Sequence, residues 1–440
     1  MAKIWHWATR RLLLVLLCLL GACSPAPAPA PAEVPTTPLA RPAPLPTPRP
    51  TAPPPVTAIL QPTAPPGALV LWASIDGQQL EALRRLIAEV SQPLGIEVQL
   101  IGKSADGLHA DLRAAALSGL PLPDLLWGTQ DDLGIVQRQG LLQPAADGLD
   151  AGAFLPAVIA GATLEGQRWG TPLAAQGSLF LLYNRRLVER PPRTSDELIV
   201  AARAQTSGDR YGLVAGWAEP RWLAAWLAGV GGATLGPDGA PDLDTPQMLA
   251  ALNLLKELRI AGPPAPSTYA DGARLFAGGQ AAFAIDGDWS LEGYRQYTDT
   301  LDLGIAPMPV VPSSGRVAAP PLGGIYMMYG KSLDGVQLER GRALGAALAQ
   351  PATQARLARD LGLLPALRAA LADPAVRENP ALATAAAQID GAAGLPPTRA
   401  LRCAWSAIAA ELPLVLLGDV RQEDAGQLMQ ASAANCMATP

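Results

Sequence analysis

The chain is poor in the residues that usually hold metal ions. It has two histidines in 440 residues, and only His109 lies outside the apolar N-terminal segment, so we expect it to be a surface residue. No Cys-x-x-Cys or His-Glu-x-x-His spacing occurs, and these spacings mark the common zinc sites. We therefore expect no metal centre and no cofactor. Three carboxylates close in sequence fit a calcium site or a surface turn rich in Pro and Gly equally well: Asp238, Asp242 and Asp244.

A surplus of positive charge is also missing. The 33 Lys and Arg residues face 38 Asp and Glu residues, which gives a formal net charge of −5. No run of basic residues interleaves with aromatics, as it does along many nucleic-acid-binding surfaces. We therefore exclude nucleic acid as a partner.

The chain lacks the usual signatures of an enzyme. It has no Gly-x-Ser-x-Gly motif, and one histidine outside the N-terminal segment leaves little basis for a Ser–His pair. Asp286 and Asp288 resemble a glycosidase carboxylate pair, but Gly287 between them leaves their geometry open. The run from Gly324 to Gly330 resembles a phosphate loop, yet five bulky residues separate its glycines, which favours a buried strand. We expect no catalysis, and a secreted glycoside-active enzyme is the less favoured alternative.

The first 22 residues have the pattern of an export signal. Three basic residues precede the uncharged run Leu12–Ala22, which is too short to span the roughly 30 Å core of a bilayer. Leu20-Gly21-Ala22-Cys23 resembles the lipobox of bacterial lipoproteins, in which the cysteine is acylated and becomes the first residue. We predict a signal peptide at 1–22 and lipidation at Cys23, hence a protein anchored to the outer face of the cell membrane. The alternative is an ordinary secretory signal that contains a chance cysteine.

Residues 23–66 are predicted to form a spacer. Seventeen prolines occur among the 43 residues from Ser24 to Pro66, and proline both removes backbone donors and favours extended conformations. A semi-rigid tract of this kind reaches up to on the order of 100 Å from the membrane at about 3.1 Å per residue. A proline-rich docking motif is the alternative.

The rest of the chain is long enough for two lobes. Its two cysteines, Cys403 and Cys436, are predicted to form a disulfide in an exported protein, or otherwise to be small core residues. Strand-like and helix-like segments alternate at its start as βαβαβ, which predicts a parallel sheet covered by helices: 68–73, 79–90, 96–101, 108–118 and 123–127. Ligands bind beyond the carboxyl ends of such strands, where this sequence has Trp72, Asp76, Trp127 and Asp131.

The segment from Arg168 to Leu198 resembles extracellular solute-binding proteins of the maltose-binding type. It contains Tyr-Asn-Arg-Arg-Leu (183–187) followed by Pro-Pro-Arg-Thr-Ser-Asp-Glu (191–197), in which Thr194 and Glu197 predict a capping box at a helix start. Further matches follow in chain order: Glu219-Pro220, Phe276–Trp289, Gly304–Pro309, Leu322–Ile325 and Ala404-Trp405.

The resemblance implies a two-lobed α/β fold of the periplasmic-binding-protein kind. Each lobe is expected to be a mainly parallel sheet flanked by helices, and the strands that cross between the lobes form a hinge. Lobe 1 is expected at 67–174 plus about 325–370, and lobe 2 at about 175–324 plus about 371–440. The ligand is expected in the cleft between the lobes.

The resemblance also indicates site residues. The positions at or beside the family's cleft are Trp72, Asp76, Asp131, Gln176, Glu219, Trp222, Trp289 and Trp405, and Trp127 adjoins another. Gln176 stands where the best-known member has a sugar-binding glutamate, and Gly128 where it has a tryptophan. The identity of the ligand therefore does not carry over.

The aromatic composition independently favours a carbohydrate. The chain has ten tryptophans and four phenylalanines, and flat indoles beside carboxylates or amides suit the apolar faces and hydroxyl edges of a pyranose. Each tryptophan taken alone fits an anchor between helix and sheet equally well, and Trp289 and Trp405 are the two most strongly expected in the cleft.

The sequence thus predicts the substrate-binding component of an ATP-binding-cassette (ABC) importer. It is expected to be a monomer that captures a sugar or oligosaccharide and delivers it to membrane permease subunits. The alternative within the same fold is a solute-binding module that serves a sensor.

Overall fold

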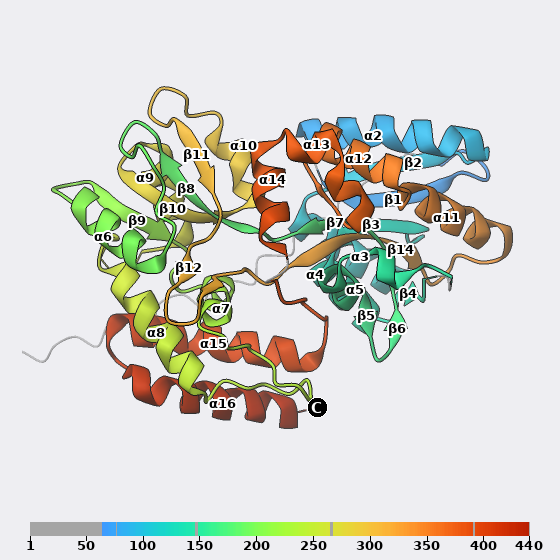
Figure 1. The fold of residues 1–440 in the computed structure, drawn as a ribbon. Coiled ribbons are helices and arrows are strands. Elements are labelled where there is room, and N and C mark those ends of the chain that lie inside the picture. The colour runs from blue at the N-terminus through green and yellow to red at the C-terminus, as the bar shows by residue number, and fades with distance from the viewer. Residues whose placement is uncertain (1–63, 76, 146–147, 265–266, 390–391, 440) are drawn as a thin grey trace, which may run out of the picture. The chain divides into compact units, whose positions relative to one another are not determined.

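The computed structural model describes residues 64–439, except 76, 146–147, 265–266 and 390–391. The predicted signal peptide, Cys23 and nearly all of the predicted spacer lie outside these residues, as does Asp76. The described part contains two main sheets, one of seven strands and one of four (Figure 1).

The large sheet begins with the predicted βαβαβ unit. Its strands β1 (Leu69–Ser74), β2 (Val98–Lys103) and β3 (Leu125–Thr129) are parallel, with β1 between the other two. Helix α2 (Gly77–Ser91) and helix α3 (Ala105–Ser118) connect them, as predicted. Strands β2 and β3 each begin and end about two residues later than predicted. The later end of β3 matters for the site, because it places Trp127 inside the strand, and β1 also ends one residue later than predicted, beyond Trp72.

The other strands of the large sheet run antiparallel to their neighbours. They are β4 (Leu142–Gln143), β7 (Gly170–Gln176), β14 (Gly323–Gly330) and β15 (Leu364–Pro365). Strand β14 is buried throughout, which confirms that the run from Gly324 to Gly330 is a buried strand and no phosphate loop.

The small sheet has the order β11-β8-β10-β9. Its strands are β8 (Leu179–Asn184), β9 (Tyr211–Ala215), β10 (Ala281–Gly287) and β11 (Leu303–Ala306). Only β9 and β10 pair in parallel. Both sheets are therefore mixed, which corrects the expectation of mainly parallel sheets. The reason lies in the crossovers: β7 leaves the large sheet towards β8 and β14 re-enters it, so Gln176 at the end of β7 pairs with Gly323 at the start of β14.

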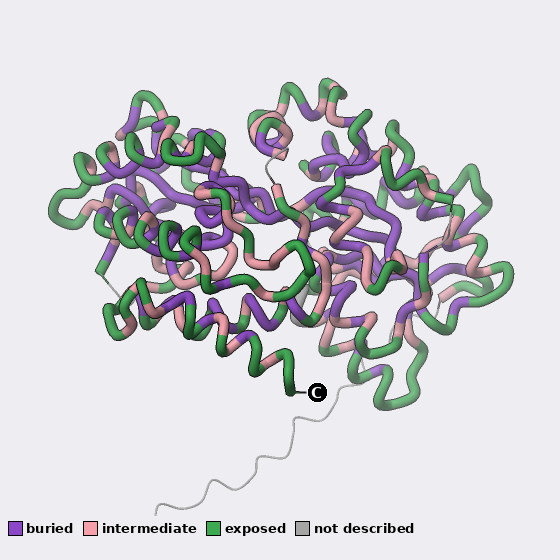
Figure 2. Tube along the Cα trace, turned by 60° about the horizontal axis from the view of Figure 1, so that its bottom comes forward, coloured by how far each residue is buried: buried purple, intermediate pink, exposed green. Residues whose placement is uncertain are grey.

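Helices cover both sheets and bury their strands (Figure 2). Those following the βαβαβ unit up to β14 are α4 (Gln130–Arg138), α5 (Pro156–Ala162), α6 (Ser195–Gln205), α7 (Pro220–Gly229), α8 (Pro246–Arg259), α9 (Tyr269–Ala277) and α10 (Leu291–Tyr294). Those after β14 are α11 (Gly335–Leu348), α12 (Pro351–Leu361), α13 (Pro374–Arg377), α14 (Pro380–Ala387), α15 (Arg399–Leu417) and α16 (Gln422–Ala438). Short strands and 3₁₀ turns complete the fold: β5 (Thr163–Leu164), β6 (Gln167–Arg168), β12 (Val310–Val311), β13 (Arg316–Val317), η1 (Gln92–Leu94), η2 (Ala151–Ala153), η3 (Asp288–Ser290) and η4 (Arg368–Ala372).

The predicted cap at Thr194 begins helix α6. The Thr194 hydroxyl accepts the backbone N–H of Glu197, as predicted. The Glu197 carboxylate accepts from the backbone N–H of Arg193, one residue before the cap, at 2.7 Å. Two backbone donors at the helix start are satisfied in this way, although the second is not the one that a standard capping box uses.

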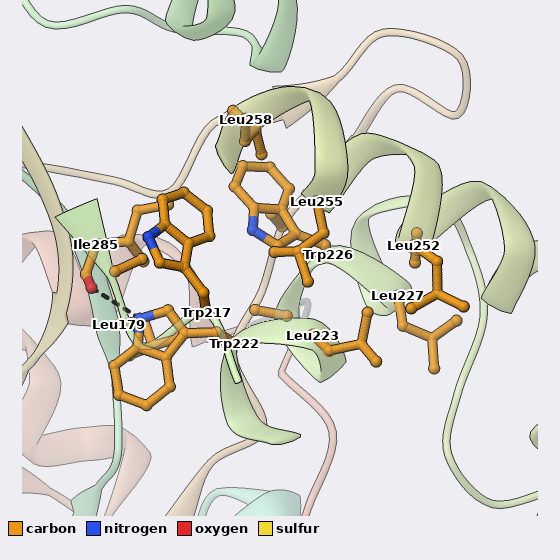
Figure 3. Close-up of a cluster of buried hydrophobic side chains, with 14 of the residues drawn as sticks. Leu179, Trp217, Trp222, Leu223, Trp226, Leu227, Leu252, Leu255, Leu258 and Ile285 are labelled. Atoms are coloured by element: carbon orange, nitrogen blue, oxygen red, sulfur yellow. Dashed lines mark hydrogen bonds between the residues drawn. The ribbon is translucent and has the colours of Figure 1, made fainter. Parts of the chain in front are cut away.

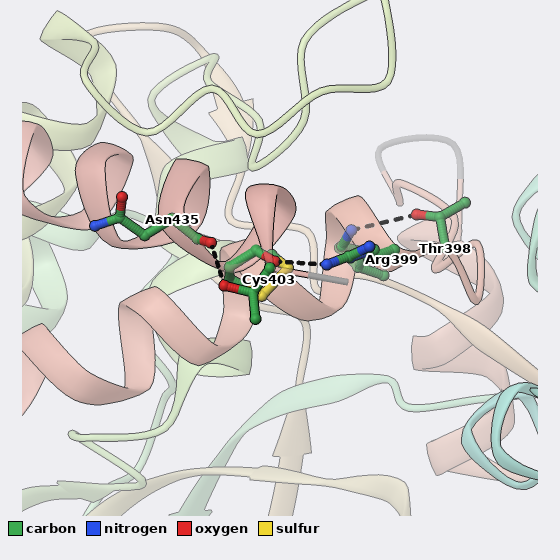
Figure 4. Close-up of a disulfide and its surroundings, with 7 residues drawn as sticks. Thr398, Arg399, Cys403 and Asn435 are labelled. Atoms are coloured by element: carbon green, nitrogen blue, oxygen red, sulfur yellow. Dashed lines mark hydrogen bonds between the residues drawn. A yellow bond between two sulfur atoms is a disulfide. The ribbon is translucent and has the colours of Figure 1, made fainter.

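The two C-terminal helices α15 and α16 pack side by side and are joined by a disulfide (Figure 4). Cys403 in the second turn of α15 is bonded to Cys436 near the end of α16, with their Cα atoms 5.5 Å apart. The Arg399 side chain also donates to the backbone carbonyl of Cys436. Helix α15 is long and apolar enough to cross a membrane, but one face packs into the core through residues such as Ile408 and Leu412.

Candidate functional site

The two crossovers between the sheets lie next to each other. The first, Gly177-Ser178, joins β7 to β8, and the second leads through Pro321 into β14. Gly177 has a φ of +97°, and a Cβ there would lie 2.7 Å from the Nη1 atom of Arg221. The crossover therefore needs glycine both for its backbone conformation and for the approach of this arginine.

Arg221, near the start of helix α7, contacts both crossovers. Its Nη1 donates to the carbonyls of Pro321 at 3.0 Å and, more weakly, of Gly177 at 3.4 Å. Its guanidinium carbon lies 5.7 Å from the ring centroid of Trp289 and 5.6 Å from that of Trp405, which is within the range of cation–π attraction. We call Arg221, Trp289, Trp405, Asp131 and Asp288 the Arg221 cluster.

Two carboxylates act electrostatically on Arg221. Burial lowers the pKa of the Arg221 guanidinium, and the negative charges of Asp131 and Asp288 oppose that shift. Asp131 lies in the first turn of α4, beside the large sheet, and remains exposed to solvent. Partial desolvation by the surrounding protein raises the pKa of Asp131, and Arg221 lowers it. The cluster thus contains a carboxylate beside the large sheet, Asp131, and one that directly follows a strand of the small sheet, Asp288.

Asp288, directly after β10, binds the first crossover through hydrogen bonds. Its Oδ2 accepts the backbone N–H groups of Gly177 at 2.9 Å and Ser178 at 3.1 Å. Its Oδ1 is buried and has no hydrogen-bond partner among the described residues. Burial raises the pKa of Asp288 to about 6, despite those two amides and Arg221.

Trp289 is the most exposed of the predicted aromatic residues, with 42% of its surface accessible. Its Nε1 donates to the hydroxyl of Tyr269 at 3.1 Å. The Trp222 ring packs edge-on against the Trp289 ring, with the two ring centroids 6.1 Å apart. The centroid of the Trp222 ring also lies 5.5 Å from that of Tyr269. Trp222 itself is only 5% exposed, and its Nε1 donates to the carbonyl of Ile285 (Figure 3). Trp222 therefore packs against Trp289 from the interior and offers little surface of its own to a ligand.

The remaining predicted site residues are Trp405, which belongs to the cluster, and two residues next to it in the chain segments that form it. Trp405 on α15 is partly buried, and its Nε1 has no partner in the described part of the chain. Gln176 precedes the first crossover, and its Oε1 is likewise buried and unpaired within the described ranges. Glu219 precedes Arg221 at the N-cap of α7, is exposed, and makes no capping bond with its side chain. Three buried polar atoms near the first crossover or the cluster thus have no partner among the described residues: Oε1 of Gln176, Oδ1 of Asp288 and Nε1 of Trp405.

Trp72 and Trp127 do not face the expected cleft. Each is 1% exposed and packs in a hydrophobic core beneath the helices of the large sheet. The prediction placed both at strand ends, but β1 continues to Ser74 and β3 to Thr129. Residues inside a covered strand point into the core. His109 also differs from its prediction, because it is partly buried and its Nε2 lies 2.6 Å from a carboxylate oxygen of Asp132.

The sequence patterns missed Arg221 and Tyr269. Arg221 lies directly after Glu219-Pro220, which was recognised, but an arginine in a first helical turn has no periodicity that marks it as part of a site. Among the three candidate calcium residues, Asp238 accepts the backbone N–H of Ala240 within its own turn. Among the described residues, no three His, Cys, Asp or Glu side chains are placed to hold a metal ion.

Comparison with known proteins links this arrangement to one family. Residues 86–384, more than half of the chain, match the family described as "Bacterial extracellular solute-binding protein". The maltotriose-binding protein of Pyrococcus abyssi is 23% identical over 359 residues, which cover 80% of this chain and 78% of the relative.

Solved structures of sugar-binding proteins share the fold. The maltose/maltodextrin-binding domain of Bdellovibrio bacteriovorus, bound to maltotriose, is 25% identical and superposes with a TM-score of 0.69, covering 84% of this chain and 99% of that one. The maltose-maltodextrin binding protein of Alicyclobacillus acidocaldarius gives a TM-score of 0.71 at 23% identity, covering 83% and 100%.

Proposed function

Because the chain belongs to the family of bacterial extracellular solute-binding proteins, we propose that it captures a sugar or oligosaccharide and delivers it to the permease of an ABC importer. The observation that carries the carbohydrate assignment is the Arg221 cluster. It combines an exposed indole, a second partly exposed indole, a cation and carboxylates at the place where both crossovers meet. We propose that the protein acts as a monomer and binds its solute between the two lobes.

Each part of the cluster has a role in binding a sugar. The faces of Trp289 and Trp405 suit the C–H faces of pyranose rings. The exposed carboxylates of Asp131 and Glu219 accept hydrogen bonds from hydroxyl groups. The Arg221 guanidinium donates a hydrogen bond to a hydroxyl oxygen of the sugar. A ligand with many hydroxyl groups therefore suits the exposed carboxylates beside the two indoles.

In this proposal, the two crossovers form the hinge about which the lobes close. Lobe 1 then comprises 67–174 with about 325–370, and lobe 2 about 175–324 with about 371–440. Arg221 and Asp288 hold both crossovers, and a few residues at element ends suffice to absorb the closure of one lobe on the other. A ligand that contacts Trp289 on one side and Asp131 on the other would stabilise the closed form.

We also propose that the protein binds its solute without chemical conversion. Asp286 is 2% exposed and accepts hydrogen bonds from Tyr269, Tyr294 and the backbone of Gly287. Asp288 accepts two backbone amides. Donors hold Asp286 through both oxygens and Asp288 through Oδ2, while Oδ1 of Asp288 is buried. Neither carboxylate is therefore presented to a glycosidic bond as the general acid or nucleophile of a glycosidase would be.

The anchor is proposed from the sequence alone. Acylation of Cys23 would hold the protein at the membrane, and residues 24–66 would let the binding domain reach and rotate onto the permease. Tethering raises the effective concentration of the domain at its transporter without any new contact.

A thermal-shift screen tests the proposed ligand class. The mature domain is heated with monosaccharides, maltotriose and other oligosaccharides, polyols and glycerol phosphates. A ligand at 100 times its Kd raises the free energy of unfolding by about 2.7 kcal/mol, because it binds only the folded state. We expect a saccharide to shift the melting temperature and Trp289→Ala to reduce that shift. A shift by another class of compound with none from any saccharide would refute the carbohydrate assignment, and hydrolysis of a bound saccharide would refute binding without conversion.

A further inference from the structure

A directed chain of hydrogen bonds leads from Trp289 to a buried carboxylate. The indole N–H of Trp289 donates to the Tyr269 hydroxyl at 3.1 Å, and that hydroxyl donates to Oδ1 of Asp286 at 2.9 Å. The directions are consistent, since an indole only donates and a carboxylate only accepts. The exposed ring is thus held by an anchor in the interior.

Asp286 is built to serve as that anchor. Besides Tyr269, its Oδ1 accepts the backbone N–H of Gly287 at 2.7 Å, and its Oδ2 accepts the hydroxyl of Tyr294 at 2.6 Å. Asp286 is only 2% exposed, so a solute cannot reach it. Its effect on binding must therefore pass through the residues that it holds.

Packing restricts Trp289 on two further sides. A Cβ on Gly287 would overlap the six-membered ring of Trp289, so the indole lies directly over this glycine. Trp222 meets the ring edge-on, at an interplanar angle of 79°. Because the N–H is already used by Tyr269, the indole offers a solute its face and no free donor. The orientation of that face then decides how well it matches a sugar ring.

We propose that Tyr269 and Asp286 are positioning residues that fix the orientation of the Trp289 indole for stacking on the solute. This inference rests on the proposed function, in which Trp289 contacts a saccharide. Sequence patterns did not mark Tyr269 at all and marked Asp286 only as one carboxylate of a glycosidase-like pair. In this proposal Asp286 contributes without touching the ligand.

Two matched variants separate this role from a general effect on the fold. Tyr269→Phe and Tyr294→Phe each remove one hydroxyl that donates to Asp286, but only Tyr269 contacts Trp289. With maltotriose, or the saccharide that gives the largest thermal shift, as the probe, we expect Tyr269→Phe to weaken binding about threefold to tenfold. Tyr294→Phe should lower the melting temperature and change the Kd less than about twofold.

A double-mutant cycle then identifies the path of the effect. In a Trp289→Ala background, Tyr269→Phe should change the Kd less than about twofold, because the residue that it positions is gone. If Tyr269→Phe weakens binding equally in both backgrounds, the tyrosine contacts the ligand itself and the proposal is wrong. Equal losses of affinity for Tyr269→Phe and Tyr294→Phe would also overturn it.

A measurement without ligand keeps this inference separate from the proposed function. The indole N–H signal of Trp289, assigned by its absence in Trp289→Phe, should shift in the NMR spectrum of Tyr269→Phe and stay nearly unchanged in Tyr294→Phe. If no saccharide binds but this shift occurs, the carbohydrate assignment fails while the hydrogen-bond chain stands. If the signal does not respond to Tyr269→Phe, the chain is absent and the proposal fails, whatever the ligand.

Discussion

Replacing Trp289 by alanine tests the proposed site most directly. The indole is 42% exposed, which leaves about 100 Å² of a large aromatic side chain available to a ligand. At about 25 cal/mol per Å², complete coverage of that surface would contribute about 2.5 kcal/mol. A sugar that covers half of it would gain a little over 1 kcal/mol. We therefore expect Trp289→Ala to weaken binding by about ten- to seventyfold.

The same variant should affect the fold only moderately. The buried part of Trp289 makes an edge contact with Trp222 and one hydrogen bond with Tyr269, so we expect a loss of about 1 to 2 kcal/mol in the free energy of unfolding. Trp226 is the matched control, since it is 0% exposed and packs in the core near Leu255 and Leu258 (Figure 3). Trp226→Ala should cost about 3 to 5 kcal/mol.

Calorimetric titration and thermal melting of both variants separate binding from folding. The expected pattern is a large loss of affinity with a small loss of melting temperature for Trp289→Ala, and a large loss of melting temperature for Trp226→Ala. If Trp289→Ala instead melts far below the wild type and binds the saccharide unchanged, the indole is a core residue. The main structural reason for preferring a carbohydrate would then be lost.

Three further predictions concern the anchor, the disulfide and Asp288. Cys23→Ser should release the protein into the soluble fraction once its apolar signal is removed, and firm membrane association of that variant would contradict lipidation. Reducing the bond between Cys403 and Cys436, which lie 33 residues apart, should lower the free energy of unfolding by about 3 to 4 kcal/mol on the chain-entropy model; two free thiols in the denatured, unreduced domain would refute the pairing. Burial raises the pKa of Asp288 from 3.8 to about 6, so the folded state binds more protons between these values and loses stability as the pH rises through them. Asp288→Asn should therefore be more stable than the wild type above about pH 6, by on the order of 1 to 3 kcal/mol in the free energy of unfolding, and this difference should disappear near pH 4. Denaturant melts of both proteins at several pH values measure the difference. A difference that is the same at every pH would contradict the prediction.

Several features could be predicted because they depend on short stretches of sequence. The uncharged run before Cys23 and the seventeen prolines after it are compositional, so their interpretation needs no tertiary structure. The strand–helix order at the start of the folded part follows from hydrophobic periodicity, and Thr194 begins a helix as its pattern indicates. In Asp-Gly-Asp-Trp (286–289), a turn directly after a strand predicts an aromatic ring that leaves the sheet, and Trp289 is exposed as such a turn requires.

The tertiary structure decided the features that depend on exact strand ends or on distant contacts. Side chains alternate along a strand, and only the end of the strand leaves the cover of the helices. Because β3 ends two residues later than predicted, Trp127 lies inside the strand and is buried, where the prediction had it exposed. Arg221 acquires its role from Gly177 and Pro321, which lie 44 and 100 residues away, and no local pattern contains that information. Asp286 likewise becomes an anchor only because α9 brings Tyr269 to it. Composition and periodicity determine which segments form helices and strands, but contacts between residues far apart in the sequence exist only once the whole chain is packed.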